Sequence, residues 1–392
     1  MLSKILCSST LIVSVMLATV AVCGQQIDPE FGWSLKVEAS ERRKADQRRP
    51  PKHVQSAGSD EIQVETDLVL SDLLVQDKNG TPVHGLRAAD FEISESGSPQ
   101  KIDVFAYGDA SIPRSIILVI DHSLSQLRHI DMSIASAKVL VDSLRPNDRM
   151  AVVSDDVELI ADLTSDKEVL KSSLESLRIK CNGGKFGKSS QYSALFAALN
   201  ERISRNGTRN IVIFQTDGDE LSMIRRSRGP GLTNFRLDDI VSAAERKGVT
   251  IYTVFTGSRL GGQNMDERMK RTRRELDDQI RAFSAIRGEK VVSEGSKLSS
   301  AYIRARIERI LAEEKAVSSV AEETGGLAQS LESPDQAAAV YGRILSDIDR
   351  RYLIGYYPSE RSDTELRERE VRVTLKNKGN YRVVGGRTYV AY

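Results

Sequence analysis

The chain has 392 residues, and its 56 Lys and Arg residues nearly balance its 55 Asp and Glu residues, which gives a formal net charge of +1. This length predicts about two to three domains, at roughly 150 residues each. A balanced charge argues against a dedicated nucleic-acid-binding protein, which would carry a basic excess. With 27 glycines, 10 prolines and one long apolar run, the sequence also excludes a collagen-like chain and a polytopic membrane protein.

The long apolar run lies at the start of the chain. A short basic opening, residues 1–4, precedes the apolar segment Ile5–Val22, and the small residue Gly24 precedes the polar part. This order predicts a secretory signal peptide over residues 1–24 and therefore a secreted or periplasmic protein. Two alternatives remain, in which the segment stays as an anchor helix or Cys23 carries a lipid. In both of them, the N-terminus is the only part of the chain that meets a membrane.

Residues 25–60 and 62–110 differ in pattern. The first range is polar, has mixed charge and contains two adjacent prolines, which predicts a flexible linker. The second holds short, partly alternating apolar segments around the turn Asn79-Gly80, and Asn-Gly favours the positive φ angles of a tight hairpin. We therefore expect the first half of a small β module at residues 62–110.

Residues 351–392 return to a β pattern. Val371, Val373 and Leu375 alternate with polar residues, as on a strand with one buried face. Short strands of this kind need a partner sheet, and residues 62–110 can supply it. The two ranges together predict a smaller, β-sandwich-like module that flanks the middle of the chain.

Residues 113–350 alternate between strand and helix patterns. Ile116–Ile120 and Ile211–Phe214 are continuous apolar runs, typical of strands buried on both faces. The alternation predicts an α/β fold of the Rossmann-like class, with a doubly wound, mostly parallel sheet. Residues 259–316 interrupt it with apolar residues at helical spacing, which predicts an inserted helical hairpin. A last helix is predicted over about residues 334–350.

Oxygen-bearing side chains follow both apolar strands. Open α/β sheets bind ligands at the carboxyl ends of their strands, so these side chains lie at the edge where a site is expected. Mg²⁺ prefers an octahedron of oxygen ligands. The candidate metal ligands are two carboxylates and three hydroxyls, from Asp121, Ser123, Ser125, Ser189 and Asp217.

On these residues the sequence resembles the von Willebrand factor type A domain and its metal-ion-dependent adhesion site. That site is written Asp-x-Ser-x-Ser, then a Thr, then an Asp, and Ser189 stands here in the place of the Thr. The flanking segments also resemble the von Willebrand-related family of exported Acidobacterial proteins. These segments are Val75–Gly80, Asp90–Ile93 and Tyr352–Pro358. The resemblance covers about residues 62–390.

The resemblance implies how such a site works. In the family, the two serines of the first motif ligate Mg²⁺ directly, the Thr ligates directly or through water, and the two Asp residues act largely through water. The ion therefore stays electrophilic and accepts an Asp or Glu carboxylate from a protein or peptide partner. This implies non-catalytic binding in adhesion or envelope assembly, with Mg²⁺ (or Mn²⁺ or Ca²⁺) as cofactor. A shift of the last helix is the family's usual switch.

Three positions depart from the family pattern, and one of them is Gln126, where many relatives have Met. Ser189 keeps the hydroxyl of the family's Thr but lacks its stiff β-branched rotamer. Leu124 stands where many relatives have Gly, and a Gly that needed a positive φ could not become Leu without strain.

Two other kinds of site are weighed against this one. The segment Gly183–Ser189 is a near miss of a phosphate-binding loop, because Asn182 stands where the first glycine is required, so we expect no nucleotide. Cys181 is the only cysteine after the predicted leader, and no motif places a histidine beside it. We expect a loop or core thiol there rather than a catalytic one.

Two alternative functions remain open. A metal-dependent hydrolase would need a base beside the ion, and His122 is the candidate because it follows Asp121. Side chains at neighbouring positions usually diverge, and the sequence contains no hydrolase motif, so we expect no enzyme and no catalytic residues. The other alternative is a metal-free structural or interaction module that binds its partner through the helices of residues 259–316.

Overall fold

A computed structural model describes residues 34–37, 68–108, 111–203, 208–218, 235–257, 263–288, 298–358, 368–376, 379, 381–385 and 387–391. The predicted leader, residues 1–24, and most of the predicted linker, residues 25–60, lie outside the described residues. Among the helices that are described, none is both long and apolar enough to cross a membrane.

A seven-stranded sheet forms the centre of the protein, in the strand order β1-β8-β7-β6-β9-β10-β11. All neighbouring strands are parallel except β7 and β8. The predicted α/β fold with a mostly parallel, doubly wound sheet is therefore confirmed. The strands are β1 (Lys36–Val37), β6 (Arg114–Ile120), β7 (Arg149–Ser154), β8 (Glu158–Thr164), β9 (Arg209–Thr216), β10 (Thr250–Thr256) and β11 (Ala328–Leu331).

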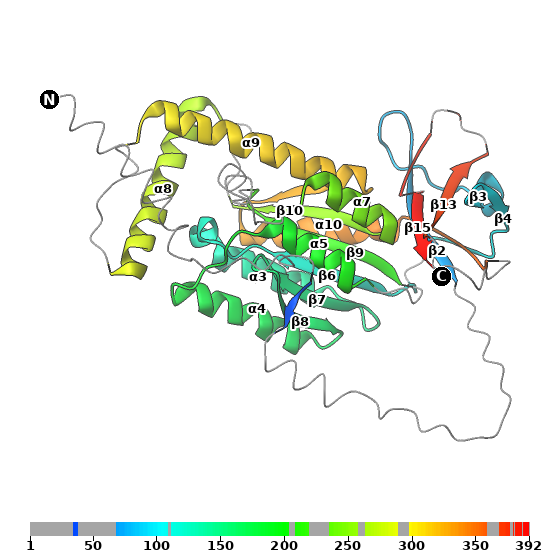
Figure 1. The fold of residues 1–392 in the computed structure, drawn as a ribbon, viewed down its shortest axis with the longest axis horizontal. Coiled ribbons are helices and arrows are strands. Elements are labelled where there is room, and N and C mark those ends of the chain that lie inside the picture. Colours follow the sequence, from blue (N-terminus) through cyan, green and yellow to red (C-terminus); the bar gives the residue numbers. More distant parts are fainter. Residues whose placement is uncertain are drawn as a thin grey trace, which may run out of the picture.

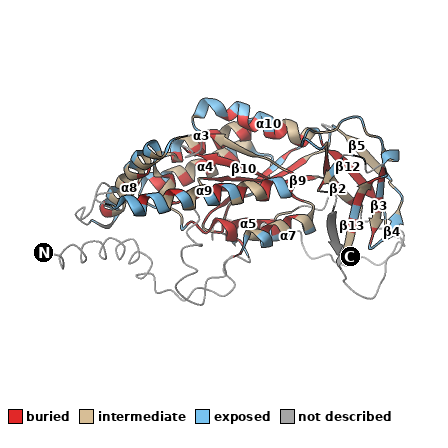
Figure 2. Ribbon diagram, turned by 90° about the horizontal axis from the view of Figure 1, so that it is seen from above, coloured by how far each residue is buried: buried red, intermediate tan, exposed pale blue. Residues whose placement is uncertain are grey.

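Helices cover both faces of this sheet (Figure 1). Alternate residues of β6 enter two separate cores, with Ile116 in one and Ile117 in the other, so the strand has no solvent-facing side. This is why the strand reads as a continuous apolar run. One core contains α3 (Ile130–Asp142), α4 (Lys167–Asn182) and α10 (Ala337–Asp349), and the other contains α5 (Gln191–Glu201), α7 (Leu237–Lys247) and α9 (Ser300–Glu323). Figure 2 shows the buried residues concentrated in the strands and on the inward helix faces.

Two four-stranded antiparallel sheets form a smaller body beside the central sheet (Figure 1). Their orders are β14-β2-β12-β5 and β15-β13-β3-β4, and each sheet combines strands from both ends of the chain. The two sheets share one apolar core, which includes Leu73, Phe91, Tyr352 and Val371. The strands are β2 (Val69–Gln76), β3 (Phe91–Glu95), β4 (Ser98–Gln100), β5 (Val104–Tyr107), β12 (Tyr352–Tyr356), β13 (Glu368–Leu375), β14 (Arg382–Val384) and β15 (Arg387–Ala391).

The expectation of a flexible linker does not hold for residues 36–37. They form β1, which pairs in parallel with β8 at the edge of the central sheet. Leu35 is buried, and its backbone N–H donates a hydrogen bond to the Glu201 carboxylate at 3.2 Å. An edge strand needs only backbone pairing and one apolar anchor, so it leaves little pattern in a polar sequence.

The inserted helices pack on each other before they reach the sheet. Helix α8 (Met265–Arg287) contacts the N-terminal part of α9 through a small core of Leu276, Ile303 and Ile307. Helix α9 then continues as one helix to Glu323, where it covers the sheet. The end of the predicted insertion, residue 316, therefore lies within one continuous helix.

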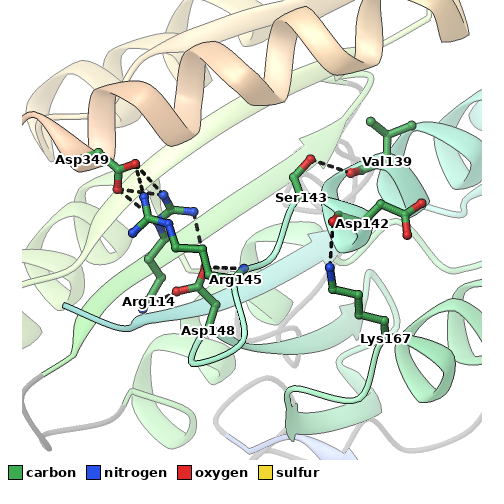
Figure 3. A network of polar contacts seen from close by, with 8 residues as sticks. All are labelled: Arg114, Val139, Asp142, Ser143, Arg145, Asp148, Lys167 and Asp349. Carbon is green, nitrogen blue, oxygen red and sulfur yellow. Dashed lines mark hydrogen bonds and ion pairs between the residues drawn. The ribbon is translucent and has the colours of Figure 1, made fainter. Parts of the chain in front are cut away.

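The C-terminal end of α10 is fixed to the central sheet by ion pairs (Figure 3). Arg114, at the start of β6, donates to Asp349 at 2.6 Å and to Asp148 at 3.3 Å, and its side chain is only 2% exposed. Arg145 also pairs with Asp349. A buried guanidinium needs carboxylate partners, so Asp349 has a structural role at this helix end.

Replacing Asp349 should therefore weaken the fold. The variant Asp349→Asn leaves Arg114 with only one carboxylate, and we expect the free energy of unfolding to fall by about 1–3 kcal/mol, measured by urea denaturation. The matched control Glu332→Gln removes an exposed charge just before the same helix and should change the stability by less than about 0.5 kcal/mol. Equal stabilities for the two variants would contradict this role.

Candidate metal centre

The first loop of the candidate centre begins where β6 ends. The backbone N–H of Asp121 donates to the carbonyl oxygen of Gln215 on β9 at 2.9 Å, so the sheet ladder extends into the loop. The Asp121 side chain is buried, and its Oδ1 accepts the N–H of Ser123 at 2.8 Å. The hydroxyl oxygens of Ser123 and Ser125 lie 2.8 Å apart. Three of the five predicted ligands are thus gathered in one turn.

Asp217 follows the neighbouring strand, β9, and lies close enough to Asp121 to act on it. Burial, then the negative charges of Asp217 and of Asp155, raise the pKa of the Asp121 carboxyl well above its usual range. The chain turns directly after Asp217, because Gly218 has a φ of +83° and its N–H donates to the Thr216 hydroxyl at 2.9 Å. The ends of β6 and β9 therefore bring these two carboxylates together, as the sequence predicts.

Ser189 reaches the same edge on a separate loop. Its side chain is buried, and its loop is joined to the first one, because the N–H of Gly187 donates to the carbonyl oxygen of His122 at 3.0 Å. Ser189 has a φ of +55°, a left-handed conformation that β-branched residues adopt only at a high cost. Serine keeps the hydroxyl in this conformation, which is a physical reason for its presence in place of Thr.

Asp155 is a member of the cluster that the sequence interpretation missed. It directly follows β7, is fully buried, and accepts hydrogen bonds from the N–H of His122 at 3.0 Å and of Ser189 at 2.7 Å. It thereby joins the two hydroxyl-bearing loops. Its position after a third neighbouring strand was the available signal, because the rule that selects Asp121 and Asp217 applies to it equally.

The electrostatics of the cluster fit a cation. The Oδ2 atom of Asp121 is buried without a hydrogen-bond partner, with two further carboxylates near it. A buried, unpaired carboxylate is unfavourable, and a divalent ion would compensate it. Within the described ranges, no three His, Cys, Asp or Glu side chains form a metal-binding group. The candidate ligands are instead a mixed set of hydroxyls and carboxylates, which suits a hard ion.

The two groups considered for catalysis lie in unsuitable surroundings. Burial opposes protonation of His122, but the Asp155 carboxylate, which contacts its Nδ1, raises its pKa overall. The His122 ring is thus paired with Asp155 and is 3% exposed. Cys181 is buried as expected of a core thiol, and burial raises its pKa to about 12, so it is protonated at neutral pH.

Comparison with known proteins identifies the domain that carries this centre. Residues 116–220 match the family profile of the von Willebrand factor type A domain. This part of the chain is therefore similar to a von Willebrand factor type A domain, and the central sheet with its helices is called the A domain below. The matched range includes all five predicted ligands of the A domain and Asp155. No match was found among curated proteins.

Solved structures to which this chain is similar include two bacterial proteins and one parasite protein. BatB from Bacteroides thetaiotaomicron is 16% identical, with 60% of this chain and 98% of that chain covered and a TM-score of 0.33. A von Willebrand factor type A protein from Catenulispora acidiphila is 10% identical, with 83% and 73% covered and a TM-score of 0.34. The manganese-loaded TRAP protein of Plasmodium vivax is 12% identical, with 74% and 96% covered and a TM-score of 0.33. Identities and TM-scores this low say nothing about the function of the A domain.

Removing the charge of Asp121 should stabilise the metal-free A domain. In Asp121→Asn, the Oδ1 that accepts from Ser123 is kept, and the carboxylate form, which burial and the charges of Asp217 and Asp155 disfavour, is removed. We expect the free energy of unfolding without metal to rise by about 1–3 kcal/mol, measured by urea denaturation in EDTA. The control Glu332→Gln should leave the stability unchanged. A lower free energy of unfolding for Asp121→Asn would contradict the view that this carboxylate destabilises the metal-free protein.

Gly187 should tolerate no side chain, because it packs directly on Asp155. A Cβ built at Gly187 would lie 2.3 Å from both carboxylate oxygens of Asp155. We expect Gly187→Ala to lower the free energy of unfolding by about 1–3 kcal/mol. The matched control is Gly342→Ala in α10, where a Cβ meets nothing within 4 Å and the better helix propensity of Ala should raise stability. Thermal unfolding of both variants measures the two effects, and a tolerated Gly187→Ala would contradict this packing.

Proposed function

We propose that this protein binds an acidic group of a protein or peptide partner through a divalent metal ion held by its A domain. Mg²⁺ is the proposed ion, with Mn²⁺ and Ca²⁺ as alternatives of the same oxygen-seeking chemistry. The observation that carries the proposal is the buried Asp121 carboxylate, whose Oδ2 has no partner and which lies in the same turn as the paired hydroxyls of Ser123 and Ser125.

The proposed ligands include both neutral and charged oxygen atoms. Ser123, Ser125 and Ser189 would offer hydroxyl oxygens, while Asp121 and Asp217 would balance the charge of the ion. A bound divalent ion would supply a Lewis-acidic position for the carboxylate of a partner. Asp155 is engaged with the backbone of both loops, so it would hold the ligands in place rather than ligate.

Binding without catalysis is the activity that the neighbouring groups favour. A hydrolase would need a base with access to the ion. His122, which follows Asp121 in the sequence, is buried against Asp155. We therefore propose a non-enzymatic role in adhesion or envelope assembly. The leader-like pattern of residues 1–24 supports an exported protein as its setting.

The packing of the inserted helices argues against the metal-free alternative. A module that binds through the helices of residues 259–316 would have to offer their apolar stripes to a partner. Leu276, Ile303 and Ile307 instead pack on one another and are at most 1% exposed. These three apolar residues of the insertion are thus used inside the protein.

Metal should stabilise the folded chain if the centre binds it. We expect the melting temperature to rise with Mg²⁺ or Mn²⁺, with a gain of about 2.7 kcal/mol at one hundred times the dissociation constant. Asp217→Ala should abolish the rise, whereas Glu332→Gln should retain it. An unchanged melting curve of the wild-type protein at millimolar metal would refute the proposal.

Recognition of acidic groups requires a separate measurement. A surface that carries poly-L-glutamate should retain the Mn²⁺-loaded protein, and a surface that carries poly-L-glutamine should not. Retention should be lost in EDTA and in Asp217→Ala. Equal retention on both surfaces would contradict a carboxylate-specific site.

A further inference from the structure

Helix α8 lies at the end of the A domain that carries the candidate metal centre. In Figure 1, α8 lies at the end of the molecule opposite the small β body. That body connects to β6 at its amino end, Arg114, so α8 lies toward the carboxyl end of the strand, where Asp121 follows. The insertion therefore meets the loops that hold the predicted ligands.

The middle of α8 contacts the loop of Ser123 and Ser125. This loop continues into the short 3-10 helix of Leu124–Arg128, and Arg128 forms an ion pair with Asp278 on α8. Ser125 shares a cavity of about 10 Å³ with Glu275 and Asp278. Such a volume holds about one water molecule and no side chain of a partner. The space on this side of Ser125 is thus filled by α8.

The C-terminal part of α8 contacts the loop that leads to Ser189. A Cβ built at Gly184 would lie 3.0 Å from the Cγ1 atom of Ile286, so the helix lies directly against this loop. The same helix thus contacts both loops that carry the predicted hydroxyl ligands. No other insertion of the described chain has this position.

The ion pair that joins α8 to the Ser125 loop is of a weak kind. The side chains of Arg128 and Asp278 are 43% and 29% exposed, and partly exposed ion pairs are weak and screened by salt. The buried apolar residue of α8, Leu276, packs on α9, and the apolar contact of α8 with a ligand loop named above is made by Ile286 at Gly184, not at the Ser125 loop. A separation of α8 from the Ser125 loop would therefore expose little apolar surface.

We propose that α8 is an intramolecular cover of the metal centre, which the Arg128–Asp278 pair holds closed and which an acidic partner has to displace. This inference rests on the proposed function. Glu275 and Asp278 lie beside Ser125, but they pair with Arg271 and Arg128, so the closed cover acts by obstruction and not by charge. Opening removes the obstruction.

The test uses the full-length protein with Arg128→Gln. For this variant, an open cover and a simple loss of charge predict opposite changes in the rate of metal release. Loss of a positive charge near the centre should by itself slow the release of a bound cation. Opening of the cover should instead speed the release. We expect Mn²⁺ release into excess EDTA to become about two- to fivefold faster, the range that a partly exposed ion pair supports. Arg281→Gln, which removes an exposed positive charge from α8, should leave the rate unchanged.

Hydrogen exchange of the metal-free protein supplies a readout that needs no ligand. In Arg128→Gln, the backbone amides of residues 124–129 and of α8 should exchange faster than in the wild-type protein, and Arg281→Gln should match the wild type. Asp278→Asn should reproduce the faster exchange, since it removes the other half of the pair.

The outcomes separate the cover from the proposed function. Unchanged or slower Mn²⁺ release in Arg128→Gln overturns the cover and leaves metal binding intact. Faster exchange without faster release also overturns it, because α8 would then be tied to the loop without obstructing the ion. Absence of Mn²⁺ binding by the wild-type protein refutes the proposed function and the cover with it.

Discussion

The carboxylate of Asp155 is the interaction on which the candidate centre depends. One of its oxygens accepts the N–H of His122 and the other accepts the N–H of Ser189, so a single buried side chain fixes two loops that are far apart in sequence. Gly187 makes this approach possible, because any Cβ there would overlap the carboxylate. In the function we propose, the hydroxyls of Ser123 and Ser189 share one ion, and Asp155 would hold their loops in place for it.

The same arrangement makes the centre costly without a cation. Asp155 and Asp217 raise the pKa of the buried Asp121 carboxyl, and the Oδ2 of that carboxyl has no hydrogen-bond partner. Groups that a ligand needs are commonly unfavourable in the free protein, since stability and function impose different demands. The buried carboxylates at this edge thus lower the stability of the metal-free A domain, and metal binding would offset this loss.

The opposite end of the sheet is held by a second set of buried charges. Arg351, just after α10, donates to Asp72 on β2 at 3.0 Å, and Arg209 on β9 donates to the same carboxylate at 3.3 Å. Arg209 also donates to the carbonyl oxygen of Ile348 in α10 at 2.9 Å, so α10, β9 and β2 meet at one point. Both arginines are at most 1% exposed, and their pairing joins the A domain to the small β body. Asp349 adds a further tie to the end of α10. A movement of the last helix would have to break these pairs, which links that helix to the orientation of the β body.

The sequence by itself determined the class of the fold and most of the candidate ligands. Continuous apolar runs identified β6 and β9, and the acidic residues after them followed from the rule that strand ends meet at one edge of a sheet. Only the tertiary structure placed Asp155 between two loops, paired Lys36–Val37 with β8, and laid α8 against Ser125. The physical reason is that periodicity reports which face of an element is buried, whereas strand order and loop contacts are decided by residues far apart in the chain.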